Sequence, residues 1–99
     1  MDKIYKYRLD TADEQLLTLP AGARILSVAE QYGDIVVYAI VDVEQTAHEF
    51  FKFYIRGTGH PFGINLDTAR FLGTVKLHSG AIMFHVFYES ALSGEEWTP

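Results

Sequence analysis

Hydrophobic and polar residues alternate with a period of two along most of the chain, which is typical of strands that bury one face. The segments with this pattern are 4–9, 15–19, 24–31, 50–56, 70–78 and 81–89. A further segment, 35–43 (IVVYAIVDV), is apolar on both faces, so we expect it in the middle of a sheet. In the fifth alternating segment we expect Phe71, Gly73, Val75 and Leu77 to share one face.

Turn residues separate these segments, and Gly33 and Ser79–Gly80 mark tight turns. Two stretches offer a helical alternative. The segment 44–49 could start a helix, although six residues are too few to be stable alone. Asn65 could cap one helical turn through Ala69, or a strand could simply start after it. The pattern predicts an all-β fold, an antiparallel sandwich or barrel-like meander of six to seven strands, with one short helix as the α+β alternative.

The composition indicates a single folded domain that spans residues 1–99 and has a short polar tail from about residue 89. A chain of 99 residues suffices for one compact core, and 48% hydrophobic residues is too apolar for a disordered protein. The absence of cysteine excludes disulfides, thiolate metal sites and a cysteine nucleophile.

The charge and hydropathy restrict the partners. The net charge is −5 and the eight Lys and Arg residues are scattered, which argues against direct nucleic-acid binding. No apolar run approaches the roughly 20 residues of a membrane helix. The first ten residues lack the apolar core of a secretion signal, so we expect a cytoplasmic protein that does not contact membranes.

The stretch RGTGHPFG, residues 56–63, is the best candidate for a site. Consecutive N–H groups of Gly57, Thr58 and Gly59 can form an anion-binding concavity, and Arg56 and His60 can supply cationic donors. The stretch is not a P-loop, because it lacks the Gly-Lys-Ser/Thr ending and a following helix. The simpler interpretation is a strand connection shaped by glycine and proline. We retain the hypothesis that it binds a small anionic ligand.

The remaining polar residues predict no chemistry. The histidines are at positions 48, 60, 78 and 85, without the close spacing of a metal site. No serine sits in a nucleophile elbow. We therefore expect no catalytic residue, no metal and no cofactor. His85, a half-buried histidine of a strand, could still contribute to a ligand pocket together with the 56–60 stretch.

The aromatic residues divide into two groups. We expect the first in the core and in cross-strand pairs: Tyr5, Tyr7, Phe51, Phe53, Phe71, Phe84 and Phe87. The second suits an interface or a stacking surface: Tyr38, Tyr54, Phe62 and Trp97. Segments 35–43 and 81–88 carry more apolar surface than one layer can cover, which predicts a homo-oligomer.

Three motifs carry a family resemblance: LPAGARIL at 19–26, GTGHP at 57–61 and HVF at 85–87. With the strands between them, they resemble a family of small uncharacterised proteins from bacteriophages and bacteria over residues 3–88. The resemblance implies a phage or prophage accessory protein and no established activity.

A small acidic protein of that origin is expected to bind rather than catalyse. One version resembles the phage proteins that sequester nucleotide-type immune signals in the host cytoplasm, with Arg56, Gly57, Thr58, Gly59, His60 and His85 as ligand-binding residues. The alternatives are an inhibitor that docks on a host defence enzyme and a structural or assembly protein of the virion.

Overall fold

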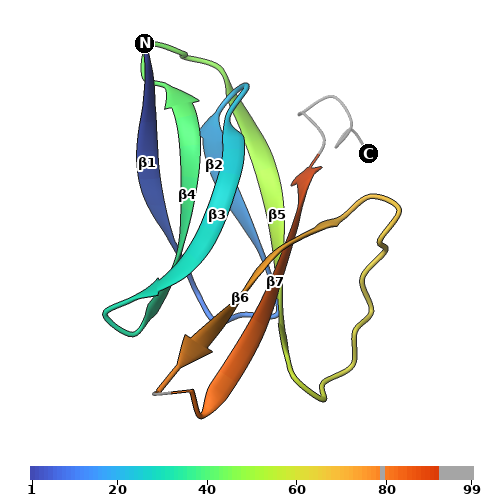
Figure 1. Ribbon diagram of the computed structural model, residues 1–99. Coiled ribbons are helices and arrows are strands. Elements are labelled where there is room, and N and C mark those ends of the chain that lie inside the picture. The colour runs from blue at the N-terminus through green and yellow to red at the C-terminus, as the bar shows by residue number, and fades with distance from the viewer. Residues whose placement is uncertain (79, 92–99) are drawn as a thin grey trace.

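The computed structural model describes residues 1–78 and 80–91, which form seven β-strands (Figure 1). The strands are β1 (Asp2–Leu9), β2 (Glu14–Pro20), β3 (Arg24–Gln31), β4 (Asp34–Asp42), β5 (His48–Gly57), β6 (Arg70–Leu77) and β7 (Ile82–Ala91). No helix occurs in these residues, so the all-β prediction is confirmed and its helical alternative is wrong.

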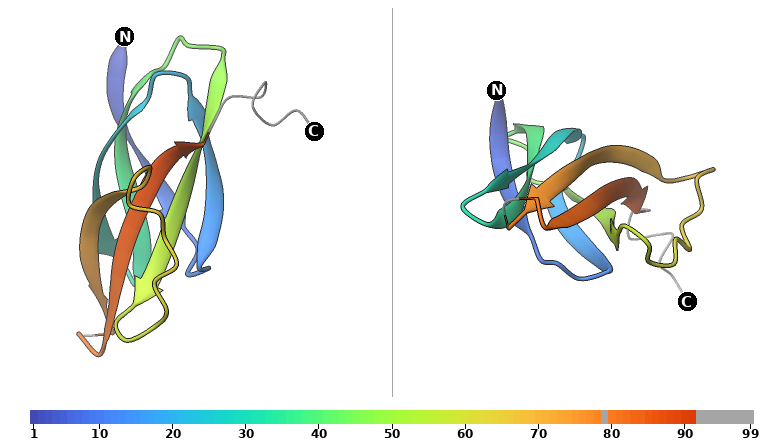
Figure 2. Two further views of the ribbon diagram at one scale, coloured as in Figure 1. Left: turned by 90° about the vertical axis from the view of Figure 1, so that its right-hand side faces the viewer. Right: turned by 60° about the horizontal axis from the view of Figure 1, so that its bottom comes forward.

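The strands form two open antiparallel sheets that pack as a sandwich rather than a closed barrel (Figure 2). The smaller sheet has the order β1-β4-β3 and the larger sheet β2-β5-β7-β6. The middle position of β4 confirms the prediction for the segment that is apolar on both faces. Only β3–β4 and β6–β7 are hairpins of consecutive strands, since β1 pairs with β4 and β2 pairs with β5.

The core lies between the two sheets and takes side chains from both of them. Its largest fully buried members are Phe53, Leu9, Leu19, Ile35, Ile55, Val37, Val41 and Val86. Burial of one such side chain stabilises the fold by about 1.5–3 kcal/mol. The sequence pattern therefore places the core correctly, because these residues occupy the apolar positions of the alternating segments or belong to the strand that is apolar on both faces.

A β-bulge in β6 overturns one prediction. The register against β7 shifts between Phe71 and Gly73, so the side-chain alternation changes face there. Val75 and Leu77 face the core, whereas Phe71 is 58% exposed on the opposite face of the sheet. The expectation that Phe71 shares a face with Val75 and Leu77 is thus wrong, whereas its expected cross-strand pairing is present, with Phe87.

The same bulge brings the edges of the two sheets together. A Cβ atom on Gly73 would lie 2.8 Å from Cγ1 of Val28 in β3, which is closer than carbon atoms normally approach. Val28 packs against the core, and its short branched side chain has little freedom to move aside. Glycine at position 73 therefore permits the contact between β6 and β3.

The turns follow the sequence in most places. Tyr32 and Gly33 connect β3 to β4 with φ values of 54° and 86°, the geometry of a type I′ hairpin turn. Residues 65–69 form the single turn that the sequence allowed. The Oδ1 atom of Asn65 accepts from the N–H of Asp67 at 2.9 Å, and its carbonyl accepts from the N–H of Ala69 at 3.0 Å. The turn does not continue into a helix, and β6 begins at Arg70.

The last strand includes the start of the predicted C-terminal tail. Residues 89–91, which the sequence placed in a polar tail, belong to β7, and residues 92–99 lie outside the described residues. Ser79 and Trp97 lie outside the described residues. In residues 1–78 and 80–91 the structure has no helix that is long and apolar enough to cross a membrane.

Replacing the glycine at the contact between the sheets tests this account of the fold. We expect Gly73→Ala to lower the free energy of unfolding in urea by about 1–3 kcal/mol, because the added methyl group overlaps Val28. In a Val28→Ala background the same substitution should cost clearly less. Equal costs in the two backgrounds would show that the contact between β6 and β3 does not restrict this position.

Candidate functional site

The candidate site lies on the face of the larger sheet that points away from the core, which we call the outer face. It consists of alternate residues of three strands: Lys52, Tyr54 and Arg56 of β5, His85, Phe87 and Glu89 of β7, and Phe71, Thr74 and Lys76 of β6. The strand pairing arranges them in rows. One row contains Arg56, His85 and Thr74, and the next contains Tyr54, Phe87 and Phe71.

The long connection from β5 to β6 crosses part of the outer face, as the left view of Figure 2 shows. Ile64 and Ala69 from this connection are buried against Tyr54, and Phe87 packs beside them. This second, smaller core fixes the connection on the sheet. Tyr54, which the sequence suggested as an interface residue, is therefore buried within the chain itself.

His85 is held by two threonine hydroxyls. Its Nε2 atom is 2.8 Å from Oγ1 of Thr58, and its Nδ1 atom is 2.9 Å from Oγ1 of Thr74. A neutral imidazole has one donor and one acceptor nitrogen, so one hydroxyl donates to the ring and the other accepts from it. Because Thr58 belongs to the connection and Thr74 to β6, the imidazole also links the connection to the sheet.

Arg56 holds two segments of backbone. Its Nε atom donates to the carbonyl of Phe62, and its Nη1 atom donates to the carbonyls of Asp13 at 2.8 Å and of Ile55 at 3.2 Å. The guanidinium carbon also lies 5.7 Å from the ring centroid of Tyr54. Arg56, which the sequence suggested as the cation of an anion site, thus uses its Nε and Nη1 atoms to position the backbone around β5.

The glycine-rich stretch forms a compact turn. The N–H of His60 donates to the carbonyl of Gly57 at 3.1 Å, and Gly59 has a φ of 88°, as the third residue of a type II turn requires. The His60 ring lies over Gly57, where a Cβ atom would be 2.9 Å from it. Of the six predicted site residues, the structure brings Thr58 and His85 into direct contact and uses Arg56, Gly57, Gly59 and His60 to shape the connection.

An exposed aromatic cluster lies beside the row that contains His85. The ring centroids of Phe71 and Phe62 are each 5.3 Å from that of Phe87. Phe71 and Phe62 are exposed, so the cluster presents aromatic surface to the solvent. Sequence reasoning did not include Phe71 and Thr74 in the site. The pairing across the β6–β7 turn predicts Thr74 near His85, but the bulge that exposes Phe71 has no clear sequence signal.

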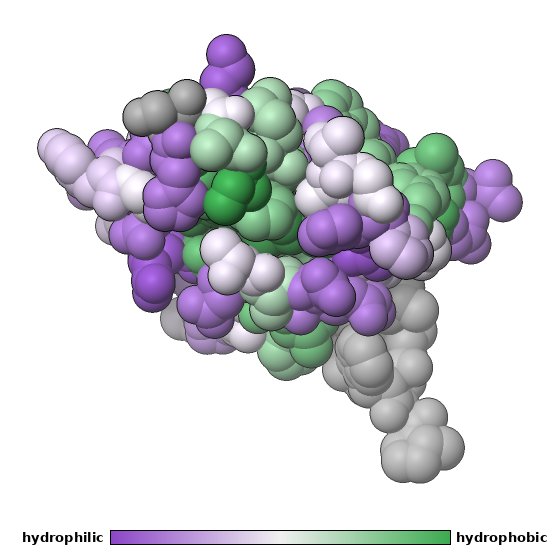
Figure 3. Space-filling view, turned by 90° about the horizontal axis from the view of Figure 1, so that it is seen from below, coloured by the Kyte–Doolittle hydropathy of each residue, from purple (hydrophilic) through white to green (hydrophobic). Residues whose placement is uncertain are grey.

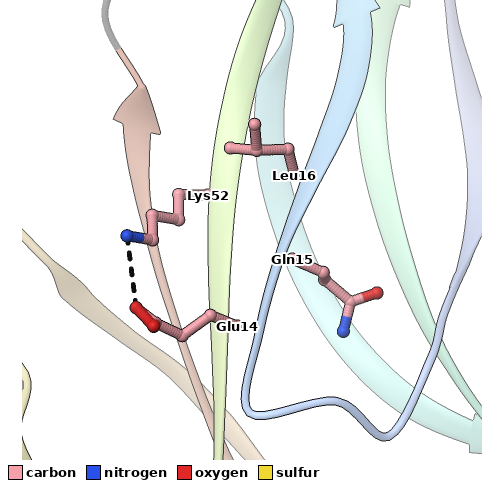
Figure 4. A pocket seen from close by; sticks show the side chains of 4 residues that line it. All are labelled: Glu14, Gln15, Leu16 and Lys52. Atoms are coloured by element: carbon pink, nitrogen blue, oxygen red, sulfur yellow. Dashed lines mark ion pairs between the residues drawn. The ribbon is translucent and has the colours of Figure 1, made fainter.

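The other end of the outer face carries an open hollow of about 230 Å³, lined by Glu14, Gln15, Leu16 and Lys52 (Figure 4). Nζ of Lys52 and Oε1 of Glu14 are 3.2 Å apart, and this bond raises the pKa of Lys52. Glu14 is the first residue of β2.

Figure 3 shows the molecule from below, where apolar and polar side chains of the described residues lie side by side and no single polar surface covers the face. Within the described part of the chain, no three His, Asp or Glu side chains gather as ligands for a metal ion. His85 with its two threonine partners, next to the aromatic cluster, is therefore the candidate site on this face.

The fold defines a small two-sheet β domain. A family model for a domain of unknown function, DUF7352, matches residues 1–96, so the chain belongs to that family. This confirms that the chain is a member of an uncharacterised family. No curated protein and no solved structure matches the chain.

The buried phenol of the outer face gives a prediction for alkaline pH. Burial, the hydrogen bond to Glu89 and the charge of Glu89 raise the pKa of Tyr54 above its ordinary value of 10.0. The folded state thus holds this proton more tightly than the unfolded state. The associated stability is complete below pH 10 and is lost as the pH rises through the folded-state pKa.

We expect Tyr54→Phe to reduce the loss of unfolding free energy between pH 8 and pH 11, measured by urea unfolding. Burial also raises the pKa of Tyr7, so part of the loss should remain. Tyr32→Phe is the matched control, because that phenol is 95% exposed and should leave the pH dependence unchanged. A loss as large in Tyr54→Phe as in the unsubstituted chain would contradict the prediction.

The hydrogen bonds of Arg56 predict that this side chain contributes to stability and holds the β5–β6 connection in place. Lysine at this position cannot reproduce the fork that reaches the carbonyls of Phe62 and Asp13. We expect Arg56→Lys to lower the free energy of unfolding by about 1–3 kcal/mol and to speed chymotrypsin cleavage after Phe62. Arg24→Lys, an exposed substitution on β3, should change neither quantity. Equal cleavage rates in the two variants would show that Arg56 does not hold the connection.

Proposed function

We propose that the chain is a non-enzymatic binding module that takes a small nucleotide-type ligand on its outer face. The observation that carries the proposal is the position of an exposed aromatic ring, Phe71, directly beside the imidazole of His85, which is hydrogen-bonded to Thr58 and Thr74. A planar base and its polar substituents need these two kinds of surface side by side.

Phe71 offers a stacking platform. The residue is 58% exposed, and its ring packs against that of Phe87 on the neighbouring strand β7. Phe62 contacts Phe87 edge to face, so the supporting ring is itself held in place. A base that stacks on such a platform gains about 1–3 kcal/mol, whatever its identity.

The polar groups continue along the same face. Thr74 lies opposite His85, and the following outward residue of β6 is the exposed Lys76. Residues two apart on one face of a strand are separated by roughly 7 Å. The order of aromatic, hydroxyl and ammonium groups therefore suits the base, sugar and phosphate of one nucleotide. The net charge of −5 favours a small ligand over a nucleic-acid polymer.

The surroundings of His85 support binding rather than catalysis. Both ring nitrogens bond to threonine hydroxyls, whereas a general base is usually oriented and stabilised by a carboxylate. The resemblance to phage and bacterial proteins supports the narrower form of the proposal. In that form, the ligand is a nucleotide immune signal that a phage or prophage protein sequesters in the cytoplasm of its host.

Native mass spectrometry tests the proposal with AMP, GMP, cyclic AMP, cyclic GMP and cyclic di-AMP as probes, and adenosine as the probe without phosphate. We expect a discrete adduct with at least one nucleotide. Phe71→Ala should raise its dissociation constant roughly 5- to 150-fold, the equivalent of one lost stacking contact. Leu16→Ala is the matched control, because it removes an exposed side chain from the same sheet beside the hollow.

Three other results of this experiment would change the proposal. No adduct with any nucleotide would overturn the proposed function and favour a host protein or the virion as partner. An adduct weakened by Leu16→Ala and not by Phe71→Ala would move the site to the hollow beside Glu14 and Lys52. Equal affinity for adenosine and AMP would show that the phosphate is not bound and that Lys76 does not contribute to binding.

A further inference from the structure

We infer that β1 is an interaction edge that pairs antiparallel with β1 of a second copy of the chain, which joins two β1-β4-β3 sheets into one. The inference is independent of the proposed ligand. It rests on the state of the four sheet edges, on the exposure of β1 side chains, and on the charges along β1.

Three of the four edge strands carry features that hinder pairing. β3 has a register shift between Ile25 and Ser27, and β6 has one between Phe71 and Gly73. Such bulges bend an edge and interrupt its row of hydrogen-bonding groups. The third strand, β2, ends in Pro20, which has no N–H group to offer.

The fourth edge, β1, has no such interruption. It pairs with β4 in one continuous register from Asp2 to Leu9 and contains neither proline nor glycine (Figure 1). An unbroken edge of eight residues is a template for another strand.

The side chains of β1 are incompletely covered. Leu9 is buried in the core, but the exposure of the core-facing positions increases towards the start of the strand, and Tyr5 is 45% exposed. The sequence predicted Tyr5 as a core residue, and the structure corrects this. On the other face Ile4 is 63% exposed. A strand paired with β1 would cover part of both side chains.

The backbone of β1 offers its hydrogen bonds at the even-numbered residues. The N–H of Val43 donates to the carbonyl of Met1, the pair that precedes Asp2 and Asp42 in the register. In an antiparallel pair the hydrogen-bonded positions alternate. The odd-numbered residues of β1 therefore bond to β4, and the N–H and C=O groups of Asp2, Ile4, Lys6 and Arg8 point away from it.

The charges favour one self-complementary register. If Tyr5 lies opposite Tyr5 of the second copy, then Asp2 lies opposite Arg8 of that copy and Ile4 opposite Lys6, with no like charges opposed. A two-residue slip in one direction places Lys6 against Lys6 and Asp2 against Asp10, which is unfavourable. The slip in the other direction shortens the paired length. The register centred on Tyr5 uses the outward groups of all four even-numbered residues.

Sedimentation velocity from low micromolar to submillimolar concentration tests the inference on the full chain. We expect a monomer–dimer equilibrium. Ile4→Pro should abolish the dimer and keep the far-ultraviolet circular dichroism of the monomer, because it removes an N–H group that does not bond to β4. Ile4→Ala is the matched control and should retain the dimer.

A charge exchange tests the register. Asp2→Arg and Arg8→Asp each place two like-charged pairs in the dimer, so each should raise its dissociation constant about tenfold or more. An equimolar mixture of the two variants restores opposite charges and should form a heterodimer. If Asp2→Arg alone weakens the dimer, the register centred on Tyr5 is wrong.

Hydrogen exchange followed by NMR gives a readout that does not depend on substitutions. The N–H groups of Ile4, Lys6 and Arg8 should become protected as the concentration rises, whereas those of Lys3, Tyr5 and Tyr7 should be protected throughout. A monomer at submillimolar concentration, or a dimer that Ile4→Pro leaves intact, would overturn the inference.

Discussion

The approach of β6 to β3 at Gly73 is the constraint on which much of this structure depends. The missing side chain lets β6 lie against Val28, and this closes the sandwich along one side. The bulge that delivers Gly73 to this contact also turns Phe71 onto the outer face. One irregularity in one strand therefore both joins the two sheets and exposes the aromatic ring of the proposed site. On the other side of the sandwich, the first half of β1 is left partly uncovered.

The candidate site and the fold share the same side chains. Thr58 and His85 connect the β5–β6 segment to the sheet, and Arg56 ties it to the corner before β2. Groups that a sequence suggests as ligand contacts are thus already used to position backbone. This arrangement suits a binding surface that is formed before its ligand arrives, since few side chains need to be ordered on binding.

The strand pattern was sufficient to predict the all-β class, the segments of the seven strands and the middle position of β4, because alternation and apolar runs are local properties. It could not predict that Phe71 leaves the core, because a bulge depends on how β6 pairs with β7 and on the contact with Val28. For the candidate site, the sequence suggested Thr58 and His85 as ligand contacts but did not predict that they contact each other. It assigned Arg56 to a ligand, because local sequence does not show that the guanidinium reaches the carbonyls of Phe62 in the same connection and of Asp13, which is 43 residues away.

The strand order also has a consequence for the route by which the chain folds. Only the β3–β4 and β6–β7 hairpins can form from neighbouring segments, whereas β1 must wait for β4 and β2 for β5. Each of these later pairings closes a long loop, and topologies rich in such pairings fold slowly, on the millisecond-to-second scale. Until β1 arrives, β4 is itself an unprotected edge and the most apolar strand of the chain. In the native fold, the pairing of β1 with β4 covers this apolar strand on its second edge.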